Sequence, residues 1–399
     1  MAYEYIENFK NLGFGLFVHF GLYSVVGKGE WYLYHDPTAD KEKYNALPQR
    51  FRVHPQWAEK LVKTAKNAGC RYITLTTRHH DGFSLYDTCG LNDFDAPHSA
   101  CGRDLIREFV TACRKENIVP VFYHTLLDWH HPAYQTDFPK YIDYLDKSIE
   151  ILCRNYGEIG GFWFDGMWNK PDEDWQEDRL YGTIRKYQPN AMIINNTGLD
   201  ACGKTGHIEI DSVTFERGKP GFVDTSKKPI AGEMCQVLND HWGYARNDCN
   251  YKSTKELIEN LLDCRKYNCN FLLNTGLRGN GEVNTTDKCL LSEIGKFVKS
   301  TKGFIYHAKA SDMTADNADI LTDGEYYYAV IHNVGMRADP NVAQCADSRT
   351  VTLHTDKKVK SAVWLDNGKK VEFKDAHTFD VLPFSYGISY TARVAKIKF

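Results

Sequence analysis

Gly160-Gly-Phe-Trp-Phe-Asp-Gly-Met-Trp168 is a short apolar run that ends in a single carboxylate, Asp165. Such a run predicts a strand of a parallel sheet that is buried on both faces. Gly166 follows at once and could let a ligand come close to the backbone. A carboxylate at the carboxyl end of a barrel strand is the usual place of a catalytic group, while a helix N-cap is the plainer alternative. The aromatic residues around Asp165 would supply flat apolar walls, which suit a sugar ring.

The rest of residues 1–303 repeats this pattern, and most of the apolar runs are separated by amphipathic helical segments. The predicted strands are 15–21, 71–77, 118–125, 160–165, 191–195, 212–216, 230–237 and 270–274. The predicted helices are 55–69, 104–117, 139–156, 175–187, 253–267 and 290–300. This alternation predicts the α/β class and a closed (β/α)₈ TIM-like barrel, irregular because no long helix separates the sixth and seventh strands. A doubly wound sheet is the structural alternative, but no Gly-rich phosphate loop follows the first strand.

A second pattern begins near residue 304. Short strand-like runs lie between turn signals such as Asp366-Asn-Gly368, and these runs are 325–332, 350–353, 361–364 and 388–390. Their spacing predicts a small antiparallel β-sandwich. We therefore expect a catalytic barrel over residues 1–303 and a C-terminal β-sandwich over residues 304–399. No low-complexity linker lies between them, so the two parts should pack tightly.

The composition limits the classes of partner. The chain has 399 residues, is 42 % hydrophobic and carries a net charge of −3, with no basic block or acidic tail, so nucleic acid and membranes are not expected partners. Neither a secretory signal nor an apolar run of about 18 residues is evident. The 12 cysteines form no CxxC pair, which indicates reduced thiols and a cytoplasmic location rather than a zinc site. The oligomeric state is left open.

Polar side chains occupy the carboxyl ends of the predicted strands, where barrel enzymes bind their ligands. A single residue of this kind would more often be a satisfied core histidine or a helix cap. The same kind of residue at eight strand ends is hard to explain by structure alone. In chain order these residues are His19, His79, His80, Asp81, Tyr123, His124, Asp128, Trp129, Asp165, Asn195, Asn196, Glu216, Glu233 and Asn274.

Carboxylates beside His, Asn and Trp suggest glycoside hydrolysis. Two carboxyl groups about 5–5.5 Å apart would give a retaining enzyme, in which one ionised group attacks the anomeric carbon and the other, with a raised pKa, donates a proton. The histidines allow a rival hypothesis, a metal-dependent barrel hydrolase that uses His79-His80 and His130-His131 with Asp81 and Asp165. However, adjacent strand residues point to opposite faces, so each pair offers one inward ligand. We therefore expect no metal site.

Five motifs occur in one order along the chain. They are Phe17-Val-His-Phe-Gly-Leu-Tyr-Ser24, Gly29-Glu-Trp-Tyr32, Thr76-Thr-Arg-His-His-Asp-Gly-Phe83, Trp163-Phe-Asp-Gly166 and Asn270-Phe-Leu-Leu-Asn-Thr-Gly276. In this order and setting they resemble the motifs of the α-L-fucosidases of glycoside hydrolase family 29. The resemblance covers about residues 5 to 305, and a β-sandwich follows the barrel in that family too.

The resemblance implies a retaining exo-α-L-fucosidase that acts by double displacement on a fucosylated glycan or fucoside, without a cofactor. It implies that Asp165 is the nucleophile and that Tyr123 lies near it. The residues implied to bind the sugar are His19, Glu30, Trp31, His79 and His80. A catalytically inactive sugar-binding barrel is the alternative from another class, although the presence of Asp165 and several glutamates argues against it.

Three glutamates compete for the role of acid/base catalyst. Glu216 is preferred, because it ends a predicted strand and resembles the family's Thr-x-Glu segment. Glu233, in a segment that resembles a neighbouring family motif, comes second, and Glu209 comes third. Glu216 could instead form a structural salt bridge with Arg217 or a nearby lysine.

Two features depart from the family pattern. No arginine follows the fifth strand, where Asn196 or Arg217 could take its part, and Leu277 stands where relatives usually have proline. These departures could alter the preference for the leaving group. The C5 methyl group of fucose would also need a small apolar cleft, for which the candidates are Phe20, Phe83, Trp242 and Phe271.

Overall fold

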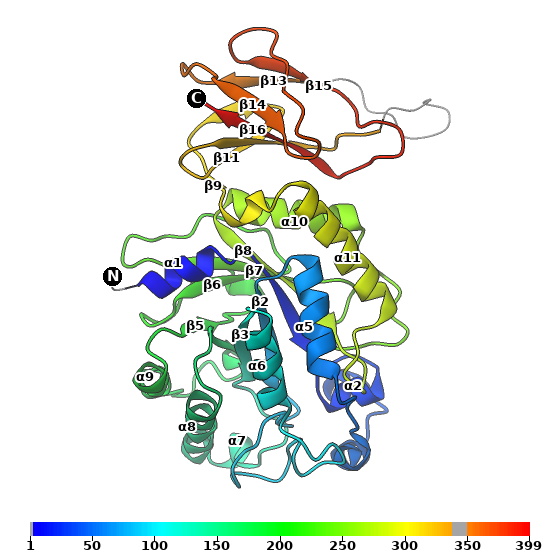
Figure 1. Cartoon of the computed structure of the whole chain (residues 1–399). Helices are drawn as coiled ribbons and strands as arrows, with labels where there is room; N and C mark the ends of the chain where they lie inside the picture. Colours follow the sequence, from blue (N-terminus) through cyan, green and yellow to red (C-terminus); the bar gives the residue numbers. More distant parts are fainter. Residues whose placement is uncertain (1–2, 337–348) are drawn as a thin grey trace.

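The computed structural model describes residues 3–336 and 349–399. Its larger part is a closed barrel of eight parallel strands in chain order, surrounded by helices, and a β-sandwich packs beside α10 (Figure 1). The barrel strands are β1 (Phe14–His19), β2 (Tyr72–Arg78), β3 (Val119–Thr125), β4 (Gly161–Asp165), β5 (Met192–Asn195), β6 (Ser212–Glu216), β7 (Ala231–Val237) and β8 (Cys269–Gly276). The predicted (β/α)₈ barrel with C-terminal antiparallel sheets is therefore confirmed.

The barrel strands are buried along almost their whole length, because helices cover the outside and side chains fill the inside. β8 closes the barrel against β1, with Gly276 opposite His19. Inward and outward side chains alternate along each strand, so Phe17 and His19 share the inner face of β1. Phe17 packs inside the barrel with Tyr123 and Trp163.

Each predicted helix of the barrel is present. The long helices are α5 (Trp57–Ala68), α6 (Leu105–Lys115), α8 (Phe138–Asn155), α9 (Glu177–Tyr187), α10 (Thr254–Lys266) and α11 (Thr285–Ser300). The short ones are α1 (Glu4–Lys10), α2 (Leu22–Val26), α3 (Tyr32–His35), α4 (Lys41–Asn45) and α7 (Ala133–Thr136). α5 ends at Gly69, whose φ of 92° is the left-handed conformation of a C-cap. α11 begins earlier than predicted, because the Asn284 side chain accepts a hydrogen bond from the Asp287 backbone N–H and caps the helix.

The barrel is irregular on one side. β5 is followed only by the 3₁₀ turn η3 (Leu199–Ala201), and no α-helix occurs over the described residues 196–230. The missing helix between β6 and β7 was predicted, whereas the missing helix between β5 and β6 was not. The long segment after β5 reaches the carboxyl end of the barrel instead of covering its outside.

Helix α1 closes the amino end of the barrel. Its Ile6 and Phe9 side chains belong to the cluster that fills the barrel interior. The Tyr5 hydroxyl donates a hydrogen bond of 3.0 Å to the buried Asp211 carboxylate, which also pairs with Arg185 at 2.6 Å. Because α1 packs into this end, the cavity that reaches the inner barrel residues Phe17 and Trp163 opens at the carboxyl ends of the strands.

The C-terminal part contains two antiparallel sheets. One has the order β10 (Thr314–Asp316), β13 (Arg349–His354), β15 (Thr378–Val381). The other has the order β14 (Ser361–Trp364), β16 (Ala392–Lys398), β12 (Tyr327–His332), β11 (Asp319–Thr322), β9 (Lys309–Ala310). The predicted strand at 388–390 is wrong: Ile388 is 43 % exposed, lies after a turn and belongs to no strand. The buried Ala392–Lys398 segment forms the last strand instead.

Apolar packing joins the sandwich to the barrel. The predicted boundary between residues 303 and 304 falls between α11 and the 3₁₀ turn η4 (Phe304–Tyr306). The Phe304 ring packs at 5.6 Å from the ring of Tyr328 on β12. Both rings belong to the same buried cluster as the barrel helices, so no solvent layer separates the two parts.

A half-buried ion cluster adds to this interface. The His332 ring on β12 contacts Glu259 of α10 at 2.5 Å and Asp319 of β11 at 3.1 Å. Burial disfavours the charged ring, but the hydrogen bonds to Asp319 and Glu259 outweigh it and raise the pKa of His332 to about 9. The ring is therefore a cation at neutral pH and holds carboxylates from both parts of the chain.

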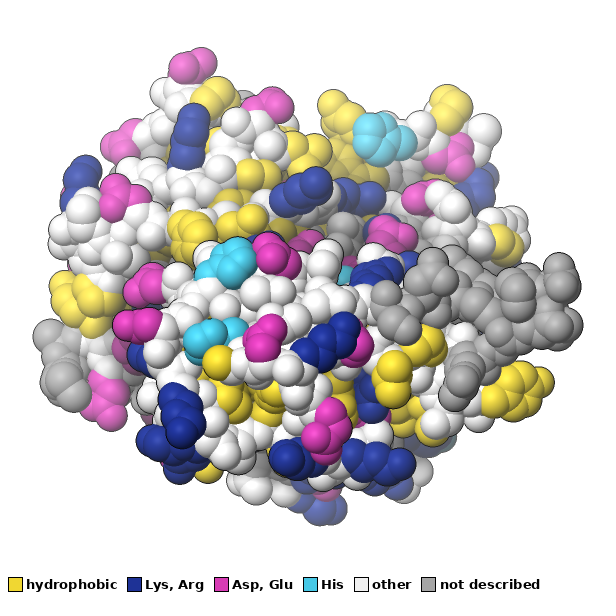
Figure 2. Space-filling model, turned by 90° about the horizontal axis from the view of Figure 1, so that it is seen from above, with side chains coloured by type: hydrophobic (Ala, Val, Ile, Leu, Met, Phe, Trp, Pro, Cys, Tyr) yellow, Lys and Arg dark blue, Asp and Glu magenta, His cyan; other side chains and the backbone are white. Residues whose placement is uncertain are grey.

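The surface seen from the sandwich end carries both acidic and basic side chains across the same face (Figure 2). This mixture accords with the small net charge of −3. Within the part of the chain that the structure describes, no helix has the length and apolar character needed to cross a bilayer.

Candidate active site

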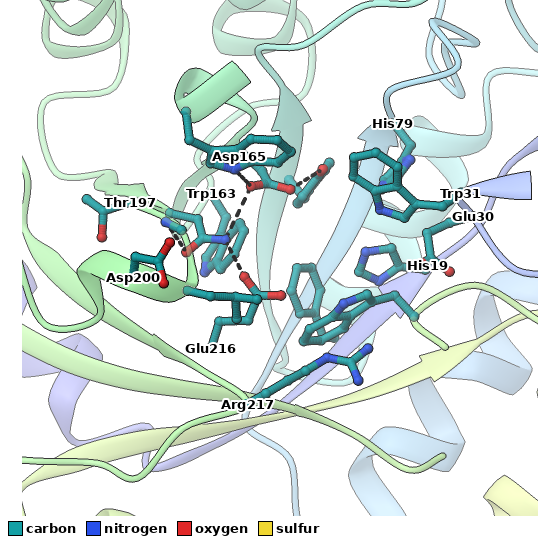
Figure 3. A pocket seen from close by; sticks show the side chains of 17 residues that line it. His19, Glu30, Trp31, His79, Trp163, Asp165, Thr197, Asp200, Glu216 and Arg217 are labelled. Carbon is teal, nitrogen blue, oxygen red and sulfur yellow. Dashed lines mark hydrogen bonds between the residues drawn. The ribbon is translucent and has the colours of Figure 1, made fainter. Parts of the chain in front are cut away.

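A cavity of about 770 Å³ opens at the carboxyl ends of the barrel strands (Figure 3). Its floor is formed by Phe17 and Trp163, which are almost fully buried. Its walls come from strand ends and from the segments that follow them. The other lining residues are His19, Glu30, Trp31, His79, Tyr123, Asp165, Trp168, Asn196, Thr197, Gly198, Leu199, Asp200, Glu216, Arg217 and Trp242.

Asp165 ends β4 and its carboxylate faces this cavity. One oxygen, Oδ1, accepts hydrogen bonds from Asn196 Nδ2 and from the indole N–H of Trp168, each 3.2 Å long. The other oxygen, Oδ2, accepts from the Tyr123 hydroxyl at 3.1 Å. The side chain is 15 % exposed, so it remains accessible to a ligand while its neighbours fix its orientation. No hydrogen bond to a helix N-terminus is present among these contacts, so the N-cap alternative does not describe this residue.

Glu216 ends β6 and points into the same cavity. Asn196 Nδ2 donates to its Oε2 at 2.7 Å, and the same nitrogen donates to Asp165 at 3.2 Å. The two carboxylate oxygens therefore lie no further apart than these two bonds together, about 6 Å, and this upper limit accommodates the separation of about 5–5.5 Å typical of retaining glycosidases. Burial, followed by the nearby charge of Asp165, raises the pKa of Glu216 to about 7.

Arg217 does not form the salt bridge that was considered for Glu216. Its guanidinium lies 5.1 Å from the ring centre of Trp242 and donates to the backbone carbonyl of Asp240. Its φ of 50° places the backbone in the left-handed region, which is strained for a side chain of this size. Of the two residues suggested to replace the missing family arginine, Asn196 contacts both carboxylates.

Glu233 does not line the cavity. It lies opposite Thr214 in the barrel, deeper than Glu216. Its two oxygens accept hydrogen bonds from the Tyr72 hydroxyl at 2.5 Å and from the Trp163 indole N–H at 2.9 Å. Burial raises the pKa of Glu233 to about 7, but the floor residue Trp163 stands between it and the cavity.

Glu209 lies outside the barrel, where it pairs with Arg185 at 2.9 Å. Neither Glu209 nor Glu233 can therefore reach a ligand in the cavity. Of the three acid/base candidates, Glu216 is the one that lines the cavity with Asp165.

Three histidines surround the inner part of the cavity. Burial lowers the pKa of His19 to about 3, that of His80 to about 4, and that of His79 well below its usual range, so all three are neutral at pH 7. The Nδ1 of His19 donates to the Asn274 side-chain oxygen at 2.6 Å, because the Asn274 nitrogen is engaged with a carbonyl. This leaves His19 Nε2 as an acceptor for a ligand hydroxyl group.

His80 is placed differently from the other two. It does not line the cavity, but its Nε2 lies 3.5 Å from Asp165 Oδ2. Because its lowered pKa keeps His80 neutral, this contact is dipolar rather than an ion pair. His79 lines the cavity, and its Nδ1 is buried without a hydrogen-bond partner in the described structure.

Glu30 and Trp31 also line the cavity as predicted. The Glu30 carboxylate accepts the Gly243 backbone N–H at 2.7 Å, and burial raises its pKa. The Trp31 ring faces Trp168 at 6.1 Å with an angle of 22° between the planes. Tyr123 contacts the predicted nucleophile directly, as given above, so the structure brings five of the six predicted sugar-site residues to the cavity wall.

The histidine-based metal hypothesis is not favoured by these positions. His130 stacks on Phe94 at 3.9 Å, and His131 stacks on Tyr144 at 4.1 Å, so neither faces the cavity. Asp81 accepts a hydrogen bond from the Tyr44 hydroxyl at 2.7 Å. No group of three His, Cys, Asp or Glu side chains in the described ranges is arranged to hold a metal ion.

Three of the four aromatic residues suggested for the C5 methyl group are core residues. Phe20 packs on Phe51, Phe83 packs between Phe51 and Phe94, and Phe271 stacks on Phe14. Only Trp242 of the four lines the cavity. Strand alternation could have excluded Phe271, since Asn274 on the same strand points inward and Phe271 lies at the opposite parity.

Sequence reasoning missed the function of Trp168, Asn196 and Gly166. The indole N–H of Trp168 was not recognised as a donor to Asp165, and Asn196 was not recognised as a bridge between the two carboxylates. Gly166 does not serve ligand access: its φ is 102°, and a Cβ there would lie 2.8 Å from the backbone nitrogen of Leu127. A closed barrel whose open end holds an accessible Asp, a protonatable Glu and neutral histidines defines a glycoside hydrolase of the two-carboxylate class.

Comparison with known proteins gives the family. The family model for α-L-fucosidases matches residues 1–302. The tissue α-L-fucosidase of Homo sapiens is 26 % identical over 333 residues, which are 75 % of this chain and 69 % of that protein. The solved α-L-fucosidase isoenzyme 1 of Paenibacillus thiaminolyticus is 29 % identical with a TM-score of 0.85, covering 100 % of this chain and 99 % of that chain. The α-L-fucosidase AlfC of Lactobacillus casei, solved with α-L-fucose, is 26 % identical with a TM-score of 0.66, covering 75 % of this chain and 99 % of that chain.

The chain belongs to the α-L-fucosidases of glycoside hydrolase family 29. The family and the α-L-fucosidase function predicted from the sequence motifs are confirmed. The barrel and β-sandwich are shared over almost the whole chain with a family 29 α-L-fucosidase of Bacteroides thetaiotaomicron, at a TM-score of 0.81 and 21 % identity.

Proposed function

We propose that this α-L-fucosidase removes terminal α-L-fucosyl residues from fucosylated glycans or fucosides, with Asp165 as nucleophile and Glu216 as acid/base catalyst. The observation that carries the proposal is the single Asn196 nitrogen that contacts both carboxylates, because it keeps their nearest oxygens within about 6 Å of one another, a limit that accommodates the separation double displacement needs. The cavity is closed at its floor by Phe17 and Trp163, which suits an exo-acting enzyme that accepts a chain end.

In the first step an Asp165 oxygen forms a bond to the anomeric carbon while the glycosidic C–O bond breaks. Glu216 gives its proton to the departing oxygen and becomes a carboxylate. In the second step Glu216 takes a proton from water, the water oxygen bonds to the anomeric carbon, and the ester to Asp165 breaks. Both catalysts return to their starting protonation states, and the anomeric configuration is retained.

The neutral histidines would orient the sugar. His19 offers Nε2 as a hydrogen-bond acceptor, and His79 lines the cavity beside it. Since burial keeps these rings uncharged, they can bind hydroxyl groups without repelling the partial positive charge that develops on the sugar ring. Glu30, Trp31 and Tyr123 would complete the sugar site.

Azide rescue tests the two catalytic assignments separately. Asp165→Gly should lose hydrolysis of an aryl α-L-fucoside, and azide should restore turnover with β-L-fucosyl azide as the product. Glu216→Gly should be rescued with retention, giving α-L-fucosyl azide. The assignments would be contradicted if Glu216→Gly gave β-L-fucosyl azide, the product of inversion. Near-parental activity of Asp165→Asn would also contradict them. An enzyme should lose hydrolysis in the Asp165→Asn variant while this variant still binds fucose. An inactive sugar-binding barrel would show no hydrolysis to lose.

We also propose a cytoplasmic location. Eleven cysteines in the described ranges are free thiols, while the twelfth, Cys345, lies outside the described residues. Buried reduced thiols are typical of reducing compartments. Fractionation of the source cells with compartment markers would test the location.

A further inference from the structure

Four large aromatic side chains form a continuous cluster beside the mouth of the cavity. This aromatic shelf consists of Trp31, Tyr34, Trp129 and Trp168. Tyr34 stacks on Trp129 at 5.9 Å with 17° between the rings, and Trp31 meets Trp129 edge-on at 5.1 Å. Trp31 in turn faces Trp168 at 6.1 Å. The shelf therefore runs from the predicted nucleophile, which Trp168 contacts, to the protein surface.

The shelf is exposed although it is apolar. Tyr34 is 66 % exposed and Trp168 is 39 % exposed. Leaving this much aromatic surface in water is unfavourable compared with burying it. Clustered exposed apolar side chains mark a surface that a ligand covers. The core does not explain Tyr34, because the ring is mostly exposed and its aromatic partners in the described structure are other shelf members and His35.

A polar wall lies across the cavity from Trp31. Figure 3 shows Asp200 and Thr197 on the opposite side from Trp31. These residues belong to the segment after β5 that lacks a helix. A pyranose ring has an apolar C–H face and a rim of hydroxyl groups, so it would lay its face on the aromatic rings and direct hydroxyl groups toward Asp200.

We propose that the aromatic shelf is the subsite for the leaving group, and that it binds the pyranose ring to which fucose is attached. This inference rests on the proposed function, because the shelf begins at the carboxylates that would break the glycosidic bond. Its continuity with the catalytic cavity favours a leaving sugar over a second copy of the chain as the occupant. Tyr34 is the outermost member and determines the preference for a sugar leaving group over a small one.

The test compares two substrates that differ only in the leaving group. The leaving group of α-L-fucosyl fluoride is a fluoride ion, which is too small to reach the shelf. An α-L-fucosyl disaccharide instead places a pyranose ring on the shelf. The disaccharide is chosen as the one the parent enzyme cleaves fastest among 1,2-, 1,3-, 1,4- and 1,6-linked examples. Tyr34→Ala should lower kcat/KM for the disaccharide about three- to tenfold, as expected for the loss of one aromatic contact, and change the value for the fluoride less than about twofold.

Two further variants sharpen the comparison. Tyr34→Phe keeps the ring and should keep the parental preference. Tyr386→Ala removes a tyrosine that is 78 % exposed on the sandwich and should alter neither substrate. The proposal would be overturned if Tyr34→Ala lowered kcat/KM equally for both substrates or for neither. It would also be overturned if a change in sedimentation revealed a dimer through this face. A parent that cleaves the fluoride but no disaccharide would overturn the subsite alone, while a parent that cleaves neither would overturn the proposed function.

Discussion

The Asn196 bridge predicts how the pH dependence of the enzyme responds to a single substitution. Asn196 donates to Glu216 at 2.7 Å and to Asp165 at 3.2 Å, and its hydrogen bond lowers the pKa of Glu216 against the larger effects of burial and of Asp165. Asn196→Ala removes a bond that favours the ionised form of Glu216. Since a hydrogen bond to a charged group contributes about 1.5–3 kcal/mol, and about 1.4 kcal/mol equals one pKa unit, the pKa of Glu216 should rise by about one unit or more from its value of about 7.

The assay is kcat/KM between pH 5 and 10 with phenyl α-L-fucoside, whose poor leaving group needs the proton of Glu216. In the parent the rate should fall above pH 7 as Glu216 loses this proton. In Asn196→Ala this fall should move to about pH 8 or higher, while the maximum drops on the order of 100-fold because Asp165 is less well positioned. Asn195→Ala is the matched control, because Asn195 donates to Tyr181 on the outer side of the strand. An alkaline limb that stays in place or moves to lower pH in Asn196→Ala would refute this account.

Three further changes separate structural from catalytic effects. Glu233→Gln should lower the free energy of unfolding by about 1–3 kcal/mol in urea denaturation, because an amide N–H₂ would face the donor of Tyr72 or Trp163. The fall of kcat/KM at alkaline pH should nevertheless stay near pH 7. Gly166→Ala should cost at least about 1–2 kcal/mol of stability and also reduce kcat, since its φ is 102° and its Cβ would press on the backbone next to Asp165; unchanged values for both would contradict it. The pKa of His332 in the folded protein, about 9, exceeds the ordinary value of 6.5, so the stabilisation from the charged ring is complete below pH 6.5 and is lost as the pH rises through 9. Thermal unfolding should therefore show that the free energy of unfolding falls by up to about 3 kcal/mol over this range. The His332→Gln variant should lack this fall.

The barrel could be predicted from the sequence because its strands are buried on both faces. Runs such as Gly161–Asp165 are continuously apolar and contrast with the amphipathic helices between them. The sandwich was harder, because short edge strands such as Thr314–Asp316 bury few residues and show little alternation. The start of α11 was missed for a different reason. Its first turn is polar, and one of its members, Asp287, is buried through contacts with Thr275 and Tyr251 that lie far away in the sequence.

The candidate site could be predicted as a set of strand-end residues, with Glu216 ranked above Glu233 and Glu209 as acid/base candidate. The motifs placed Asp165 and five sugar-site residues at one cavity. They gave no physical reason to separate Glu216 from Glu233, because both occupy inward positions on neighbouring strands. Only the register between the strands gives their depth, and that register is a property of the closed barrel rather than of either segment.

Depth in the barrel explains why two glutamates with the same raised pKa, about 7, would have different functions. Glu233 lies below the cavity floor, where fixed donors from Tyr72 and Trp163 occupy its oxygens and no substrate atom can approach. Glu216 lies higher, where one oxygen is held by Asn196 and the side chain points into the cavity (Figure 3). A raised pKa makes a carboxyl group able to carry a proton at neutral pH, but only access to the leaving oxygen lets that proton be used. Access, set by strand register, is therefore the property that distinguishes the acid/base candidate from a structural carboxyl group in this barrel.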